Sequence, residues 1–146
     1  MDNGVPVEIH TRDAEEDTVS LLKDFQGHVR GVLHCFTGTR DLAFKALDLG
    51  FNISISGIAT FKKAEELRDV VRAVPLDRLH VETDAPYLAP TPFRGEKNSP
   101  HLVPFTARIV AQLKGVSLAE LSASTNRNAD LLFTKLPRLN ESARTL

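Results

Sequence analysis

Apolar residues follow two alternating patterns along most of the chain. Short apolar runs, typical of β-strands, occur at residues 5–10, 29–34, 51–56 and 79–84. Each run precedes a longer stretch with the apolar spacing of a helix, at residues 14–25, 42–49, 64–74 and 102–113. Four strand-then-helix units in succession predict an α/β fold built on a parallel sheet. In the first run, Val5, Val7 and Ile9 alternate and are expected to share one face of the strand.

Turn-forming residues agree with this division. A glycine or a proline lies between each helix and the strand that follows it: Gly27, Gly50 and Pro75. The segment 85–100 contains four prolines and is predicted to be an irregular loop of the kind that often carries function. Small residues after two of the strands, in Thr37-Gly38-Thr39 and Ser56-Gly57, would let a ligand approach the backbone.

The last part of the chain predicts further helices. Ser117-Leu118-Ala119-Glu120 fits a capping box, which opens a helix. A final helix is expected over residues 125–133, after a break at Asn126 or Asn128. The predicted elements are therefore four βα units followed by one or two C-terminal helices.

Length, cysteine content and charge narrow the class of protein. The 146 residues suffice for one domain, assigned to residues 1–136 and followed by a polar tail over 137–146. Cys35 is the only cysteine, so a disulfide framework is excluded, and we interpret it as a small buried residue. The formal net charge of −1 excludes a bulk basic surface, so any polyanion site must be local. The chain lacks an apolar run of the roughly 20 residues that span a membrane and lacks a signal peptide, so we expect a cytoplasmic protein without a membrane partner.

Two histidines and an aspartate end three of the four predicted strands: His10, His34 and Asp84. Because the carboxyl ends of parallel strands meet at one edge, these side chains are expected to converge. Two imidazoles and a carboxylate are suitable ligands for a divalent metal ion. The alternative for each residue taken singly is a hydrogen-bonded structural role. The remaining histidines lack this placement and are assigned to the surface: His28, His80 and His101.

A second carboxylate accompanies Asp84. Glu82 precedes it by two residues, so both side chains are expected on the same side of the strand. In a metal site, Asp84 could also accept a proton from an attacking water molecule. The alternative is an acidic strand end that pairs with Arg78 or Arg94.

Cationic residues near this predicted site could meet phosphate oxygens. Arg12 lies just beyond the first strand, and Arg94 and Lys97 lie in the proline-rich loop. A further pair, Lys62 and Lys63, is expected to face solvent. The first three are therefore the candidate substrate-binding residues.

These residues stand in sequence strings that resemble the TatD family of metal-dependent deoxyribonucleases. The strings are Ile9-His10-Thr11-Arg12-Asp13-Ala14, His34-Cys35-Phe36-Thr37-Gly38, Ile55-Ser56-Gly57 with Thr60-Phe61-Lys62, and Glu82-Thr83-Asp84-Ala85-Pro86-Tyr87-Leu88-Ala89-Pro90. Arg94-Gly95, Asn98 and Pro100 fit the family's loop after the last strand. The resemblance runs from about Val5 to Phe133.

The resemblance implies half of a (β/α)8 TIM-type barrel whose one- or two-metal centre hydrolyses phosphodiesters from the 3′ end of DNA. By motif, His10, His34 and Asp84 would be metal ligands, and Asp84 would also be the proton acceptor. Glu82 would be a supporting acid. The implied cofactor is a divalent cation, Mg²⁺ first, with Mn²⁺ and Zn²⁺ as alternatives. The implied partner is DNA, as single strands or 3′ ends.

The chain departs from the family pattern because it contains only part of the family's motifs. The family's His-x-His pair is absent from these residues, and a complete barrel needs about 250 residues, so the chain resembles the C-terminal half. We expect it to be impaired alone, and either a missing N-terminal half or a homodimer would complete the barrel. Two other functions stay open: a non-catalytic half-barrel module that needs a partner chain, and a metal-dependent hydrolase of another ester or a lactone.

Overall fold

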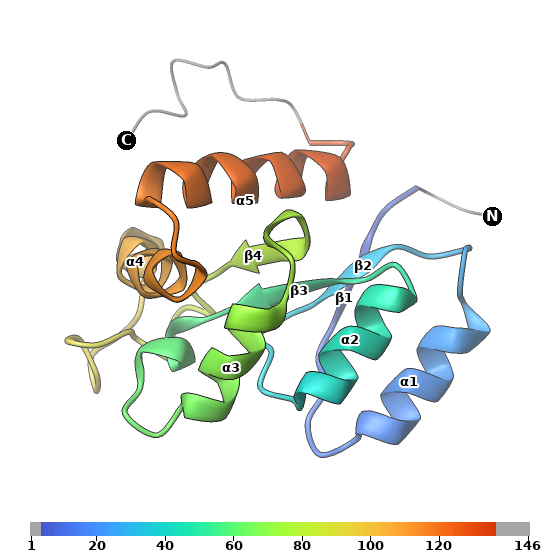
Figure 1. The fold of residues 1–146 in the computed structure, drawn as a ribbon, viewed down its shortest axis with the longest axis horizontal. Helices are drawn as coiled ribbons and strands as arrows, with labels where there is room; N and C mark the ends of the chain where they lie inside the picture. The colour runs from blue at the N-terminus through green and yellow to red at the C-terminus, as the bar shows by residue number, and fades with distance from the viewer. Residues whose placement is uncertain (1–3, 137–146) are drawn as a thin grey trace.

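A parallel sheet of four strands organises the computed structural model, which describes residues 4–136 (Figure 1). The strands are β1 (Val7–Ile9), β2 (Gly31–Leu33), β3 (Asn52–Ile55) and β4 (Leu79–Val81). Each strand pairs in parallel with the next strand of the chain, in the order β1-β2-β3-β4. The prediction of four parallel βα units is therefore confirmed.

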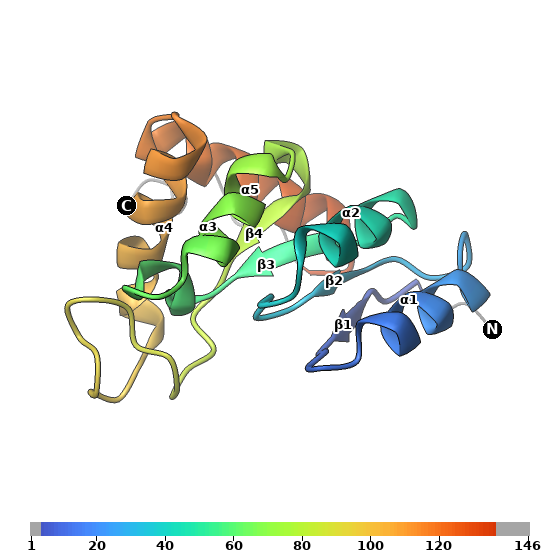
Figure 2. The same cartoon turned by 60° about the horizontal axis from the view of Figure 1, so that its bottom comes forward.

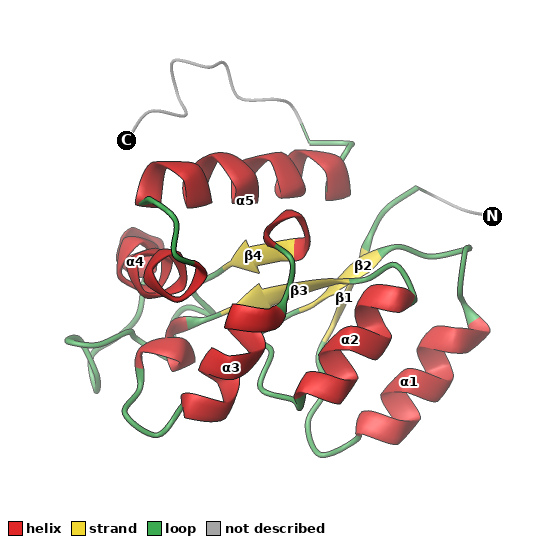
Figure 3. Ribbon diagram, in the orientation of Figure 1, coloured by secondary structure: helices red, strands yellow, loops and turns green. Residues whose placement is uncertain are grey.

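Helices connect the strands and cover one face of the sheet. They are α1 (Glu15–Asp24), α2 (Arg40–Asp48) and α3 (Glu65–Ala73), and α4 (Val103–Lys114) follows the last strand. Successive helices pack against each other in chain order, and α1, α2 and α3 form a row in front of the sheet (Figures 2 and 3). Such a row of helices outside a parallel sheet is half of the (β/α)8 pattern, as expected.

The two faces of the sheet differ in polarity because successive side chains of a strand point to opposite sides. Leu33, Ile53, Ile55 and Leu79 belong to the fully buried apolar core. The alternate positions include Ser54 and His80, which are paired in the register of β3 and β4. In a closed barrel this second face lines the interior, so the polar groups gather on the concave side.

The last helix, α5, runs without interruption over Leu118–Leu132. Ser117 caps it, since its hydroxyl accepts a hydrogen bond from the Glu120 backbone N–H at 3.1 Å. The predicted break at Asn126 or Asn128 is wrong. Asn128 does not compete with its own helix, because its side-chain amide donates instead to the carbonyls of Leu76 and Leu79, at 2.9 and 2.8 Å.

These contacts place α5 at the amino ends of the strands. Asn128 is buried and binds the carbonyl of the first residue of β4. Arg30, which directly precedes β2, donates to the Leu131 carbonyl at 3.3 Å and to the Thr134 hydroxyl at 2.7 Å. The candidate site lies at the other end of the sheet, at the carboxyl ends of the strands.

The strand β1 is shorter than predicted and lies at one edge of the sheet. It pairs only with β2 in the described part of the chain. Val5 and Val7 are 60% and 39% exposed, so the apolar alternation of this run is only partly buried. The predicted polar tail, 137–146, lies outside the described residues, and the division at residue 136 stays a prediction.

The helices of the described segment include none that is both long enough and apolar enough to cross a membrane. The cytoplasmic location stays a prediction.

His80 was assigned to the surface, and this assignment is wrong. Its side chain is only 8% exposed and lies on the concave face, next to Asn52. Arg78 donates to the Asn52 Oδ1 at 2.7 Å, which directs the Asn52 Nδ2 toward His80 Nε2 at 2.9 Å. His80 Nε2 therefore accepts this hydrogen bond and carries no proton. This network could not be predicted from the sequence, because Asn52 is 26 residues from Arg78 and 28 residues from His80.

We expect this buried histidine to make the fold sensitive to acid. Burial lowers the pKa of His80 from 6.5 to about 4, so the unfolded chain binds this proton more readily than the folded chain. Its contribution to stability is complete above pH 6.5 and is lost as the pH falls toward 4, by at most about 3 kcal/mol. Urea unfolding at neutral and acidic pH should show a smaller acid loss for His80→Gln than for the wild type. Equal losses would contradict this assignment.

Candidate metal centre

Two imidazoles meet where β1 and β2 end. His10 directly follows β1 and His34 directly follows β2. Their rings lie 5.2 Å apart between centroids, with His10 Nδ1 3.2 Å from His34 Nε2. Backbone hydrogen bonds continue the parallel pairing beyond the assigned strands, since the His34 N–H donates to the Ile9 carbonyl at 2.9 Å. The predicted convergence of these two histidines is thus found in the structure.

Glu82, which directly follows β4, fixes the other side of the His34 ring. Its Oε1 lies 3.1 Å from His34 Nδ1 and accepts a second hydrogen bond, of 2.9 Å, from the Cys35 backbone N–H. The side chains of His34 and Glu82 are 19% and 20% exposed. Because an ionised carboxylate only accepts hydrogen bonds, the proton of a neutral His34 lies on Nδ1. The Nε2 lone pair is therefore directed toward His10.

A second carboxylate, which was not predicted from the sequence, contacts the same nitrogen. Glu8 Oε1 lies 3.3 Å from His34 Nδ1, and the three groups Glu8, His34 and Glu82 are close enough together to hold a metal ion. The glutamate side chain is 65% exposed. The period of two in β1 could have revealed it, since Glu8 and His10 are two residues apart and face the same side.

Asp84 is placed differently from the two histidines. Its backbone has the left-handed φ of 56°, so the chain has already left the extended conformation two residues after Glu82. Its negative charge helps to raise the pKa of the Cys35 thiol. No contact found among the described residues joins Asp84 to either imidazole. The structure therefore brings His10, His34 and Glu82 together and leaves Asp84 beside Cys35.

Cys35 is a buried residue, as predicted, and its backbone N–H binds the Glu82 carboxylate of the site. A φ of 45° accompanies the hydrogen bond from its N–H to Glu82. Its Sγ lies 3.3 Å from the hydroxyl of Ser56. Burial first, and then the charges of Asp84 and Glu82, raise the pKa of the thiol to about 11, against the opposing effect of Ser56. Such a thiol is a poor nucleophile.

The loop after β4 is tied to the end of β3 and to itself. Thr91 donates its backbone N–H to the Thr60 hydroxyl at 2.8 Å. A Cβ at Gly57 would lie 2.2 Å from the Leu88 carbonyl oxygen, so only glycine allows this approach. Buried Asn98 donates to the carbonyls of Thr83 and Tyr87 at 2.7 and 2.6 Å. The predicted irregular loop over 85–100 is confirmed for residues 85–99, whereas Pro100 begins a short 3-10 helix, Pro100–Leu102.

The small residues Gly38 and Gly57 were expected to let a ligand approach the backbone. Instead, other parts of the same chain pack against them. A Cβ at Gly38 would lie 2.7 Å from the Leu42 side chain, and Gly57 is covered by Leu88. Thr39 caps α2, since its hydroxyl accepts from the Leu42 N–H at 3.2 Å. These positions therefore serve close packing and helix capping.

The candidate phosphate-binding cations are exposed: Arg12, Arg94 and Lys97. The guanidinium carbon of Arg94 lies 3.5 Å from the centroid of the Phe61 ring, which fixes the position of this side chain. Lys62 and Lys63 are exposed, as expected. Arg78 binds Asn52 and backbone carbonyls near β3, so the alternative in which it pairs with the acidic end of β4 is wrong. His28 and His101 are exposed, as predicted.

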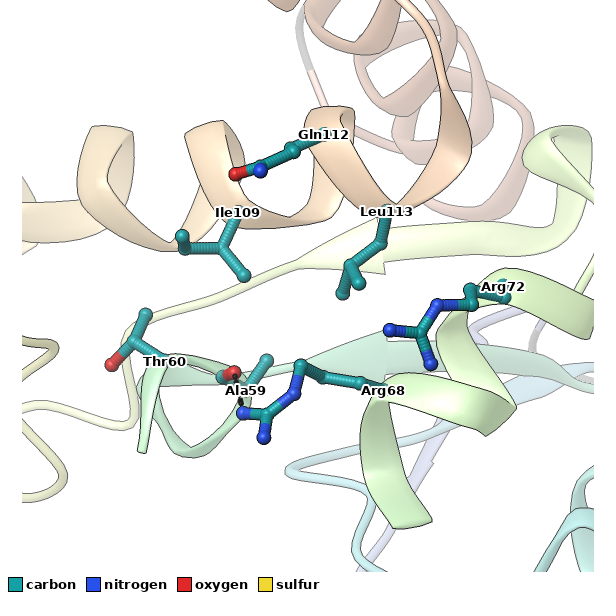
Figure 4. Close-up of a pocket in the computed structure, with 7 residues that line it drawn as sticks. All are labelled: Ala59, Thr60, Arg68, Arg72, Ile109, Gln112 and Leu113. Carbon is teal, nitrogen blue, oxygen red and sulfur yellow. Dashed lines mark hydrogen bonds between the residues drawn. The ribbon is translucent and has the colours of Figure 1, made fainter. Parts of the chain in front are cut away.

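A pocket of about 400 Å³ between α3 and α4 is a separate feature (Figure 4). It is lined by Ala59, Thr60, Arg68, Arg72, Ile109, Gln112 and Leu113. Its two guanidinium groups are already engaged, because Arg68 binds the Ala59 and Phe61 carbonyls and Arg72 binds Glu65. The lining contains no histidine and no carboxylate, so the pocket is unsuited to metal chemistry.

The fold and this cluster define a half-barrel of the (β/α)8 class that gathers imidazole and carboxylate groups at the carboxyl ends of its strands. Comparison with known proteins agrees: residues 1–134 match the family described as TatD related DNase. The chain belongs to this family.

Comparison with individual relatives shows what share of their length this chain covers. YcfH of Escherichia coli K12, named an uncharacterized metal-dependent hydrolase, is 55% identical over 129 residues, which are 88% of this chain and 49% of YcfH. YabD of Bacillus subtilis, named likewise, is 42% identical over 88% of this chain and 51% of its own. The crystal structure of YjjV, a TatD homolog of E. coli K12, superposes with a TM-score of 0.83 at 28% identity, over 90% of this chain and 51% of that chain. The chain thus spans about half the length of the curated relatives it matches.

We expect Cys35 to resist alkylation in the folded chain. A pKa raised from 9.0 to about 11 leaves roughly a hundredfold less thiolate at mildly alkaline pH, and burial restricts access further. Iodoacetamide labelling followed by mass spectrometry should therefore be at least about a hundredfold slower in buffer than in urea. Comparable rates would show that Cys35 is an accessible, activated thiol.

Proposed function

We propose that this chain contributes to a metal-dependent phosphodiesterase that acts on DNA, with His10 and His34 as metal ligands and Asp84 as the proton acceptor. The observation that carries the proposal is the pair of imidazole nitrogens, His10 Nδ1 and His34 Nε2, 3.2 Å apart at the carboxyl ends of neighbouring strands. Membership in the TatD related DNase family supports the same chemistry. The names of the relatives, as metal-dependent hydrolases, support the requirement for a metal.

The donor set fits a divalent cation. Metal–nitrogen bonds of about 2.0–2.1 Å in tetrahedral geometry place two nitrogen ligands about 3.3–3.4 Å apart, close to the observed 3.2 Å. A metal-ligating histidine commonly donates its other N–H to a carboxylate, as His34 does to Glu82. Imidazole donors suit Zn²⁺, whereas Mg²⁺ and Mn²⁺ prefer oxygen ligands. The two imidazoles therefore favour Zn²⁺ over Mg²⁺ and Mn²⁺.

The Nε2 side of His34 is the better position for the ion. The distances from Nδ1 to Glu82 and Glu8, 3.1 and 3.3 Å, are explained by an N–H that both carboxylates share. Occupying Nδ1 with a metal would remove that proton and the orientation it provides. Glu82 and Glu8 are thus positioning residues in this proposal.

The reaction roles in this proposal are assigned from the chemistry of each group. A divalent cation, when bound, polarises the phosphoryl group and lowers the pKa of water. Asp84 accepts the proton of the attacking water, and Glu82 holds His34 in one tautomer through Nδ1–H. The exposed cations Arg12, Arg94 and Lys97 bind phosphate oxygens of the substrate. These charges favour a phosphodiester over a lactone or a neutral ester.

Replacing Glu82 by glutamine should weaken metal binding. Glutamine accepts fewer and weaker hydrogen bonds than a carboxylate and no longer fixes the proton of His34 on Nδ1, so we expect about 10- to 100-fold lower affinity. Calorimetric titration of the chain with Mn²⁺, Zn²⁺ and Mg²⁺ measures this effect. Glu66→Gln, an exposed site on α3, is the matched control and should bind like the wild type. A chain that binds none of the three ions would refute the proposed metal centre.

Asp84→Asn should abolish the residual hydrolysis of DNA that we expect of this half-barrel, while leaving the fold intact. The amide cannot accept a proton from water and binds cations weakly. The assay incubates the chain with a 3′-labelled single-stranded oligonucleotide and Mn²⁺, beside a panel of small esters and lactones. Cleavage of DNA alone, lost in Asp84→Asn, is the expected result. Unchanged DNA cleavage by the variant would remove Asp84 from the proposal, and cleavage of esters alone would replace the substrate class.

A further inference from the structure

A large aromatic side chain is exposed beside the acidic end of β4. Tyr87 is 70% exposed, three residues beyond Asp84. Its backbone N–H donates to the Asp84 carbonyl at 2.9 Å, so the two residues are joined by one turn. Exposing this much aromatic surface loses the hydrophobic stabilisation that burial would supply.

The backbone under Tyr87 is fixed from both sides. Its carbonyl accepts a hydrogen bond of 2.6 Å from the side-chain amide of Asn98, which is only 3% exposed. The Asn98 backbone N–H in turn donates to the Pro86 carbonyl at 3.0 Å. The ring is therefore carried on an ordered turn, and a ligand that contacts it does not have to order the loop first.

The same loop carries positive charge. Arg94 and Lys97 are exposed, and Arg94 is held over the Phe61 ring at 3.5 Å. An exposed aromatic ring and exposed cations are the side chains that bind single-stranded nucleic acid, and here one loop carries both. Bases stack on the ring, and the cations follow the phosphates. Stacking favours an unpaired base, because the base faces inside a duplex are covered by the neighbouring base pairs.

We propose that Tyr87 is a substrate-binding residue that stacks on an unpaired nucleobase next to the scissile phosphodiester. This inference rests on the proposed function, since it assigns the substrate of the same site. It makes the site selective for single-stranded or frayed nucleic acid over blunt duplex. It also makes recognition independent of base identity, because every base offers a flat aromatic face.

The composition of the chain supplies a direct probe of this contact. Tyr87 is the only tyrosine and the chain has no tryptophan, so its intrinsic fluorescence reports on this one ring. Titration with oligothymidylate should quench the fluorescence. The titration is done in the absence of metal so that the oligomer is not cleaved. An oligomer with the same number of phosphates but abasic sugars should bind without quenching, and a blunt duplex should not quench. Absence of quenching by oligothymidylate, or equal quenching by the abasic oligomer, would overturn the proposal.

Variants separate stacking from other effects of the ring. Binding of a dye-labelled oligothymidylate, followed by anisotropy, should weaken about tenfold in Tyr87→Ala. Tyr87→Phe keeps the aromatic face and should bind within about twofold of the wild type. Phe25→Ala is the matched control, since Phe25 is an exposed aromatic residue at the far end of α1. Wild-type affinity in Tyr87→Ala would overturn the proposal.

The outcomes distinguish this inference from the function on which it rests. Metal-dependent DNA cleavage that Asp84→Asn abolishes, without quenching of Tyr87, would overturn the stacking role and leave the phosphodiesterase intact. Quenching by oligothymidylate, without metal-dependent cleavage, would refute the proposed reaction and support a base-binding site at Tyr87.

Discussion

The hydrogen bond between His34 Nδ1 and Glu82 is the interaction on which the candidate site depends. It joins the ends of β2 and β4, which are not neighbours, because β3 lies between them. Strands two apart in a sheet are separated by about 9.6 Å, so the two side chains must reach across β3. Ser54 and Ser56 occupy the intervening positions and are small and buried, which leaves room for this contact. The curvature of a barrel sheet favours the same approach, since it brings the concave side chains together.

Most side chains on the concave face are polar, with buried Val32 as an apolar exception, and the buried polar groups have hydrogen-bond partners. Near the amino ends, Arg78, Asn52 and His80 form one hydrogen-bonded network, and near the carboxyl ends Glu82 binds His34 and the Cys35 backbone. Among the described residues, no buried side-chain nitrogen or oxygen lacks a hydrogen-bond partner. The apolar face under the helices supplies the burial that stabilises the fold. The sheet can therefore keep imidazoles and carboxylates on its other face without the cost of unpaired polar groups.

Much of this arrangement could be predicted from the sequence because it depends on periodicity. The alternation of strand and helix patterns predicted the parallel sheet. The position of His10 and His34 at the ends of strands predicted that their side chains lie close together. What depended on side-chain geometry could not be predicted. In the sequence, Asn128 suggests a helix break, but its side-chain amide binds the carbonyls of Leu76 and Leu79. His80 suggests a surface residue, but it is hydrogen-bonded to Asn52. Asp84 was expected with the imidazoles, but a left-handed φ turns the chain at that residue.

The tautomer of His34 tests the central claim most directly. Long-range ¹H–¹⁵N correlation spectra of the histidine side chains, recorded at mildly alkaline pH, distinguish a protonated from an unprotonated ring nitrogen. Our account requires that His34 carries its proton on Nδ1, facing Glu82, with Nε2 unprotonated and facing His10. A proton on Nε2 with Nδ1 unprotonated would contradict it, because the lone pair would then point away from the place where the metal is proposed to bind.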